Sequence, residues 1–132
     1  MVLGPKTSIT ATLKAYNDAL VDSNTASVTK HCANTAVIMP QNFPASVGAD
    51  AIRDWYNNVF AATQLTVVFD ILEVVVASED WAFARTSSHG TQRNLKNGSE
   101  SKEGNSELFV LKSVDGEWKI ARYCFCTTNP AK

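Results

Sequence analysis

Apolar residues recur with a helical period in the first half of the chain. Three or four positions separate the members of the first set, which are Ile9, Leu13, Tyr16 and Leu20. This spacing predicts an amphipathic helix, and Ser8 is the residue expected to cap it. Asn24 is expected to cap a short second helix. A third helix is predicted after Gly48, with a broad apolar stripe formed by Ile52, Trp55, Tyr56, Val59 and Phe60.

The apolar period changes to two from Leu65 onward, which is typical of strands joined by hairpins. A short strand is also expected before the third helix. The predicted strands cover residues 36–39, 65–77, 81–91, 106–114 and 117–127. The segment at 92–104 is polar and contains Asn97-Gly98, so we interpret it as a long, mobile hairpin loop.

The strand at 65–77 contains a break in its alternation. Asp70 keeps the parity of the polar positions before it, but the next charged residue, Glu73, has the opposite parity. This predicts a bulge near Ile71 and Leu72, where the sheet bends and can wrap over a helix. Helices followed by strands predict an α+β fold, in which three helices pack on a strongly bent sheet around one small-molecule pocket.

Length and composition are those of one ordinary globular domain. A chain of 132 residues has the common size of one domain, so we expect a single domain at 1–132. Twelve basic residues are offset by thirteen acidic ones and no Lys/Arg run occurs, so nucleic acid is not an expected partner. The sequence has no apolar stretch of roughly 18 residues, and its first residues lack the basic region followed by an apolar run that is typical of a signal peptide. We therefore expect a cytoplasmic protein without a membrane partner.

Three cysteines, an odd number, argue against a secreted disulfide scaffold. Cys124 and Cys126 lie two positions apart on a predicted strand, where the separation of their side chains is too long for a comfortable bridge. Together with His31 and Cys32 they lack the C-x-x-C pairs and the H-x-x-x-H spacing that metal sites favour. We therefore expect buried free thiols and no metal site.

The last hairpin can pair in two registers. A two-residue turn at Asp115-Gly116 places Glu107 opposite Cys124, and it also places two lysines directly opposite each other, which is unfavourable. A three-residue turn with a glycine bulge places Glu107 opposite Tyr123. We prefer the second register because it groups, on one face, the residues of an apolar pocket with two polar handles: Glu107, Phe109, Tyr123 and Phe125.

Candidate chemistry comes from scattered residues, because the sequence has no phosphate-binding loop, nucleophile elbow or H-E-x-x-H motif. Glu107 is the leading candidate for a catalytic residue, because a carboxylate that faces inward from an apolar strand must be paired or neutral. The alternative is that Glu107 lies exposed at the rim of the sheet. Arg85 is either its counter-ion or a surface residue. Tyr16 is either a ligand contact or a satisfied core tyrosine. His89 lies either near Glu107 across the hairpin or in solvent.

Four local patterns in this sequence also occur in a known superfamily. They are Ala-Val-Ile-Met-Pro at 36–40, Gly-Ala-Asp-Ala-Ile at 48–52, Trp-Ala-Phe-Ala-Arg at 81–85 and Gly-Glu-Trp-Lys-Ile-Ala-Arg-Tyr at 116–123. Through them the chain resembles, over almost its whole length, the nuclear-transport-factor-2-like superfamily, and it looks closest to the small SgcJ/EcaC-like branch. The superfamily includes ketosteroid isomerases, scytalone dehydratase, SnoaL-type polyketide cyclases and limonene epoxide hydrolase. The resemblance implies a cone-shaped α+β barrel and a homodimer.

The resemblance also assigns roles to individual positions. Tyr16 and Glu107 fall where ketosteroid isomerases keep a tyrosine and a protonated aspartic acid. The position of their proton-abstracting aspartate falls at Met39-Pro40-Gln41, where no side chain accepts a proton at neutral pH. Steroid isomerase activity by that mechanism is therefore not expected. Arg85 supplies only one member of the Asp/Arg/Asp set of the epoxide hydrolases.

The function that we predict is the binding of a small, largely apolar molecule by a homodimer that needs no cofactor. If the protein is an enzyme, isomerisation, cyclisation and dehydration are the options, with Glu107 as acid or base and Tyr16 as the donor to an oxyanion. The alternative is a non-catalytic ligand-binding or dimerisation module, which the missing base favours. The other residues expected to contact the ligand are Gln41, Trp55, Arg85, His89, Phe109, Tyr123 and Phe125.

Overall fold

A computed structural model describes residues 4–129 of the chain. Three helices lie within these residues, α1 (Pro5–Val21), α2 (Thr25–Lys30) and α3 (Ala49–Ala62). The strands are β1 (Cys32–Met39), β2 (Ser46–Val47), β3 (Thr63–Val76), β4 (Trp81–Asn94), β5 (Glu100–Val114) and β6 (Glu117–Thr127). The predicted α+β class is confirmed, with β1 and β2 preceding α3 and the four long strands following it.

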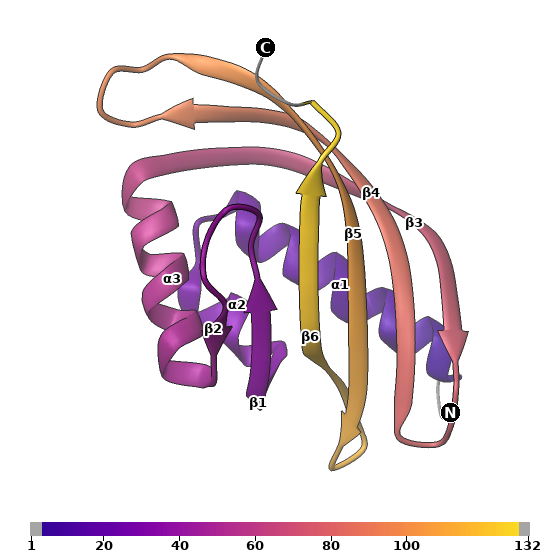
Figure 1. Cartoon of the computed structure of the whole chain (residues 1–132). Helices are drawn as coiled ribbons and strands as arrows, with labels where there is room; N and C mark the ends of the chain where they lie inside the picture. Colours follow the sequence, from indigo (N-terminus) through magenta and orange to yellow (C-terminus); the bar gives the residue numbers. More distant parts are fainter. Residues whose placement is uncertain (1–3, 130–132) are drawn as a thin grey trace.

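The strands form one mixed sheet in the order β2-β1-β6-β5-β4-β3. β1 runs parallel to β6, and the other neighbouring pairs are antiparallel. Figure 1 shows the sheet curving over α1, while α3 leads directly into β3. The two outer strands of the sheet do not meet, so the fold is an open cone with its concave side towards the helices. No helix in residues 4–129 is long and apolar enough to cross a membrane.

The helices begin at residues that favour a helix start. α1 begins at Pro5 rather than at the predicted cap, Ser8, because the fixed φ of proline suits the first turn and its missing N–H is not needed there. The Ser8 amide instead donates to the Gly4 carbonyl oxygen at 3.1 Å. The other two starts are confirmed: the Asn24 side chain accepts a hydrogen bond from an amide of α2 at 3.0 Å, and α3 follows Gly48.

The predicted bend in β3 is also confirmed. The register against β4 shifts between Ile71 and Glu73, which leaves Leu72 as the extra residue of a bulge. A close approach of the same two strands occurs at Gly90 of β4, which pairs with Val67: it has φ +154°, and a Cβ atom there would lie 2.0 Å from the carbonyl oxygen of Thr66. Only glycine allows the two strands to approach this closely at that position.

The β4–β5 hairpin is longer than the sequence predicts. β4 continues to Asn94 and β5 starts at Glu100, so the mobile loop predicted at 92–104 is mostly paired strand. The Asn94 side chain holds the turn by accepting hydrogen bonds from the amides of Lys96 at 2.9 Å and Asn97 at 3.3 Å. The segment is polar because both faces of the paired strands are polar: alternate residues face a cavity, and the others face solvent.

The β5–β6 hairpin uses the two-residue turn at Asp115-Gly116, so the preferred three-residue turn is wrong. Both turn residues have positive φ, as a type I′ turn requires. Lys112 and Lys119 do lie opposite each other. Their side chains have separate partners: Lys119 donates to the Lys30 carbonyl oxygen at 2.7 Å, and Lys112 lies 5.3 Å from the ring centroid of Trp81. These contacts offset the repulsion on which the prediction relied.

A bulge at Ala121 then changes the register of the same hairpin. Leu111 pairs with Ile120, but Val110 pairs with Arg122. Glu107 consequently lies opposite Phe125, and neither predicted partner is correct. The bulge nevertheless restores the predicted parity, so the inner face still carries Glu107, Phe109, Tyr123 and Phe125.

The core lies between the helices and the concave face of the sheet. α1 buries the set predicted from its spacing, Ile9, Leu13, Tyr16 and Leu20. α3 buries Ile52, Tyr56 and Phe60, whereas Trp55 and Val59 are only partly covered. Packing is incomplete where α3 meets the bent strands, and a cavity opens there.

Candidate functional site

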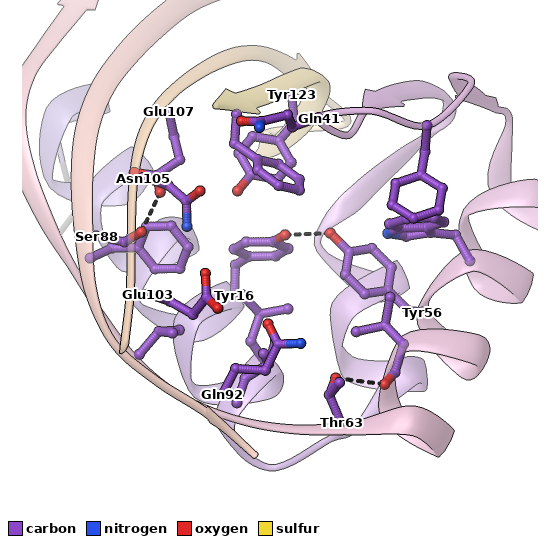
Figure 2. Close-up of a pocket in the computed structure, with 18 of the residues that line it drawn as sticks. Tyr16, Gln41, Tyr56, Thr63, Ser88, Gln92, Glu103, Asn105, Glu107 and Tyr123 are labelled. Atoms are coloured by element: carbon purple, nitrogen blue, oxygen red, sulfur yellow. Dashed lines mark hydrogen bonds between the residues drawn. The ribbon is translucent and has the colours of Figure 1, made fainter. Parts of the chain in front are cut away.

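A cavity of about 450 Å³ lies between α1, α3 and the concave face of the sheet (Figure 2). Aromatic and aliphatic side chains form most of its lining, and polar side chains enter it from α3, β4, β5 and the segment after β1. The lining residues are Tyr16, Leu20, Gln41, Phe43, Trp55, Tyr56, Asn58, Val59, Ala62, Thr63, Leu65, Val67, Phe69, Ser88, Gln92, Glu103, Asn105, Glu107, Tyr123 and Phe125.

Glu107 is a carboxylate in the cavity wall, with only 3% of its surface exposed. β5 presents it opposite Thr86 of β4, so the neighbouring strand supplies its partners. The Thr86 hydroxyl donates to Oε1 at 2.6 Å, and the Ser88 hydroxyl donates to Oε2. Each carboxyl oxygen thus has one fixed donor, which holds the group in one orientation in the wall.

Burial raises the pKa of Glu107 above its ordinary value, because an ionised carboxylate loses solvation there. The hydrogen bonds from Ser88 and Thr86 lower the pKa, but by less than burial raises it. Glu107 therefore holds its proton to a higher pH than an exposed glutamate does. A carboxyl group of this kind can serve as acid or base closer to neutral pH.

Tyrosine side chains from three elements meet beside the cavity. The hydroxyls of Tyr16 in α1 and Tyr56 in α3 are hydrogen-bonded to each other, as Figure 2 shows. The Tyr123 ring of β6 lies 5.8 Å from the Tyr16 ring, edge to face. Burial raises the pKa of all three phenols, so each stays protonated and can donate a hydrogen bond.

The family of the chain follows from comparison with known proteins. The family model of the SnoaL-like domain matches residues 13–123. The chain belongs to the SnoaL-like domain family. This confirms the predicted superfamily, whereas the SgcJ/EcaC-like branch stays a prediction. None of the curated proteins matches this SnoaL-like chain.

Solved structures agree with this assignment. A ketosteroid isomerase-like protein from Erwinia carotovora atroseptica is 33% identical, with a TM-score of 0.90 over 94% of this chain and 96% of that chain. A type 2 hexachlorocyclohexane dehydrochlorinase is 11% identical, with a TM-score of 0.82 over 94% and 85%. An NTF-2-like protein of unknown function from Shewanella oneidensis is 15% identical, with a TM-score of 0.73 over 92% and 98%. The last two show likeness of fold alone.

The SnoaL-like fold brings most of the predicted contact residues to the cavity. Gln41, Trp55, Tyr123 and Phe125 line it together with Tyr16 and Glu107. Phe109 does not: it is 1% exposed and stacks behind Tyr123, with ring centroids 4.3 Å apart. Phe109 therefore supports the wall rather than contacting a ligand.

Arg85 and His89 lie outside the cavity, so the ligand contacts predicted for them are wrong. Of the two alternatives given for each residue, the solvent-exposed position is the one that the structure shows. Odd-numbered residues of this part of β4 face solvent, while the small Ala82 and Ala84 occupy the buried positions. Arg85 Nε pairs with the Glu73 carboxylate at 3.0 Å. His89 Nδ1 lies 3.3 Å from the Asp70 carboxylate, and both side chains are more than half exposed. The partners of Glu107 are hydroxyls, so no cation is needed to hold it.

Several polar lining residues were missed from the sequence. Glu103 and Asn105 share the parity of Glu107 on β5, which would have identified them if the segment had been recognised as a strand. Ser88 has the even, inward parity of β4, which is opposite to that of Arg85 and His89, the two residues expected near Glu107. Tyr56 belongs to the predicted apolar stripe of the third helix, and it also borders the cavity. These residues make the cavity more polar than the sequence predicts.

The segment after β1 offers no proton acceptor to the cavity. Pro40 is buried, and the Gln41 amide oxygen accepts a hydrogen bond from the Thr127 amide. Within residues 4–129, no group of three His, Cys, Asp or Glu side chains is placed to hold a metal ion. The chemistry that this arrangement can perform is acid–base chemistry by Glu107, with tyrosine hydroxyls as donors.

Proposed function

We propose that the protein binds a small, largely apolar metabolite in this cavity and transfers a proton with Glu107. Isomerisation, cyclisation and dehydration are the reaction classes that suit one buried carboxyl group and phenol donors, because each moves a proton and needs no cofactor. Membership of the SnoaL-like family supports the proposal, as does a fold shared with a dehydrochlorinase.

The observation that carries the proposal is the placement of Glu107. A carboxyl group that is 3% exposed in the wall of a mostly apolar cavity costs more stability than an apolar side chain would, even with its two hydrogen bonds. A functional role accounts for its presence there. Its hydrogen bonds come from neutral hydroxyls, so the group keeps a raised pKa instead of being fixed as an ion by a cation. Such a pKa suits a proton-transfer group.

The tyrosines have a complementary role in this proposal. When Glu107 removes a proton next to a carbonyl group, negative charge develops on the carbonyl oxygen. The hydroxyls of Tyr16 and Tyr56 are joined in one hydrogen bond, so one proton of the pair remains available for that oxygen. Glu107 then returns its proton to another ligand atom, which completes an isomerisation or a cyclisation.

Replacement of Glu107 by Gln tests the proposal. A thermal-shift screen of apolar metabolites finds compounds that bind the folded protein and raise its melting temperature. NMR in D₂O then follows exchange or conversion of each bound compound. We expect Glu107→Gln to slow this reaction at least tenfold and Tyr16→Phe to slow it about tenfold, because each removes a group used in proton transfer.

The matched control is Glu100→Gln, a substitution on the same strand at an exposed position outside the cavity. It should leave the rate unchanged. An equal rate in wild type and Glu107→Gln would remove Glu107 from the mechanism. A screen in which no apolar compound raises the melting temperature would contradict ligand binding in the cavity.

A second candidate function is non-catalytic ligand binding or dimerisation. It is favoured by the segment Pro40-Gln41, which occupies the position where ketosteroid isomerases keep their base but offers no proton acceptor. Under this alternative, compounds bind and raise the melting temperature, but none exchanges or converts in D₂O.

We also propose a cytoplasmic location. Cys32, Cys124 and Cys126 are free thiols. Burial raises the pKa of Cys32 to about 12, which keeps it in the unreactive thiol form. Cys126 is exposed, and an exposed thiol persists most readily in a reducing compartment.

A further inference from the structure

The charges that line the cavity are all of one sign. Glu103 and Glu107 line it, while no lysine, arginine or histidine among residues 4–129 does so. The neighbouring basic residues of the two strands, Arg93 and Lys102, have the outward parity and are exposed. A concave surface with acidic groups and no basic ones attracts cations and repels anions.

Glu103 differs from Glu107 in its surroundings. It is half-buried, and its carboxylate points into the cavity in Figure 2. Its hydrogen-bond donor is the Ser101 hydroxyl, at 3.1 Å. The ion pairs found in residues 4–129 do not include Glu103. This carboxylate is therefore partly desolvated and has no cationic partner within the described chain.

The two carboxylates face the same cavity from one strand. Both belong to the inner parity of β5, four positions apart, which corresponds to roughly 13 Å along an extended strand. Asn105 lies between them on the same face. The spacing leaves room for the body of a small molecule with a different polar group at each end.

Aromatic rings supply a second kind of contact for a cation. Phe43 and Trp55 pack edge to face, with ring centroids 5.0 Å apart, and both line the cavity. Phe125 lies against Tyr123 at 5.6 Å on another part of the lining. The faces of such rings attract ammonium groups, so these walls accept both an apolar body and a positive charge.

We propose that Glu103 selects ligands that carry a protonated amine. The amine binds at Glu103, the apolar body lies along the aromatic walls, and the reacting part of the molecule reaches Glu107. Carboxylate and phosphate compounds are excluded by the same field. The inference rests on the proposed function, because it assumes that the cavity binds a small molecule. Glu103 acts here as a specificity-determining residue and takes no part in proton transfer.

Three compounds with one bicyclic body test the charge preference: naphthylmethylamine, naphthalenemethanol and naphthoic acid. Titration calorimetry of the full chain at neutral pH gives a Kd for each. We expect the amine to bind at least tenfold more tightly than the alcohol, and the acid more weakly than both. Glu103→Gln should bring the amine within about threefold of the alcohol, and Glu103→Lys should make the acid the preferred compound.

The outcomes separate the two proposals. Glu100→Gln is the control on the same strand, and it should leave the order of the three compounds unchanged. Binding of the alcohol without any preference for the amine would overturn the role of Glu103 and leave cavity binding intact. An amine preference that survives in both Glu103 variants would also overturn it. If none of the three compounds binds, the role proposed for Glu103 fails, and the thermal-shift screen decides cavity binding independently.

Discussion

Burial and hydrogen bonding act in opposite directions on the pKa of Glu107. Burial disfavours the ionised form, and the hydroxyls of Thr86 and Ser88 favour it. Burial has the larger effect because both donors are neutral, and a neutral donor stabilises a carboxylate less than a cation does. The residue keeps its proton to a higher pH in the folded chain than in the unfolded chain, and this difference has a measurable consequence.

The pH dependence of stability provides a test at Glu107. Its folded-state pKa is raised above 4.5, so the folded chain binds the proton more tightly. The resulting contribution to the free energy of unfolding is complete below the unfolded-state pKa and is lost as pH rises through the folded-state pKa. We expect the stability of wild type relative to Glu107→Gln to fall with rising pH, on the order of 1 kcal/mol per pH unit at its steepest.

Urea denaturation of both proteins at a series of pH values measures this difference. His31, whose pKa is lowered by burial and by nearby lysines, titrates in both proteins and cancels. Glu100→Gln should show no such pH-dependent difference from wild type. A wild-type advantage that stays constant or grows as pH rises would show that the pKa of Glu107 is not raised.

At the scale of elements, the free edge of β3 is covered by a side chain of α1. β3 ends the sheet, so its outer backbone groups lack a strand partner. The Asn17 amide nitrogen donates to the Val67 carbonyl oxygen at 2.8 Å, and its amide oxygen accepts from the Phe69 amide at 3.1 Å. Asn17 thus replaces one residue of a missing strand and fixes α1 against the lining strand of the cavity.

Asn17→Ala should destabilise the protein by about 1–3 kcal/mol, because it leaves two half-buried backbone groups without their partner. Thermal or urea denaturation measures the loss. Asn57→Ala is the matched control, since Asn57 is an exposed asparagine on α3, and its replacement should change stability little. Equal stability of the Asn17 and Asn57 variants would mean that water replaces the Asn17 side chain as hydrogen-bond partner of the β3 backbone without loss of stability.

At the scale of the whole molecule, the outer face of the sheet exposes large apolar side chains. They lie on β3, β4 and β5 and comprise Val68, Leu72, Val75, Trp81 and Leu108. Exposed apolar groups gathered on one face are typical of an interface between subunits, and we propose that this face forms a homodimer.

Light scattering at micromolar concentration tests the dimer. Wild type should have twice the mass of the chain, and Leu108→Glu should have the mass of one chain, because a charge at a paired apolar surface opposes association. Leu95→Glu changes a similarly exposed leucine at the β4–β5 turn and should leave the dimer intact. A wild-type monomer would refute the proposal.

The sequence determined the elements whose apolar period is set by local geometry. The spacing of Ile9, Leu13, Tyr16 and Leu20 predicted the buried face of α1, and the broken alternation predicted the bulge at Leu72. These features follow from the fixed periods of a helix and a strand, which depend on local backbone geometry alone.

Tertiary structure alone decided which residues meet. The register of β5 on β6 depends on a bulge at Ala121 and on partners of Lys112 and Lys119 that lie far away in the sequence. The polar stretch around Glu103 looked like a loop because cavity-facing and solvent-facing polar residues alternate there. Polarity in a sequence cannot distinguish the wall of a cavity from bulk solvent, since both accept polar groups. Only the bend of the sheet over the helices separates the two.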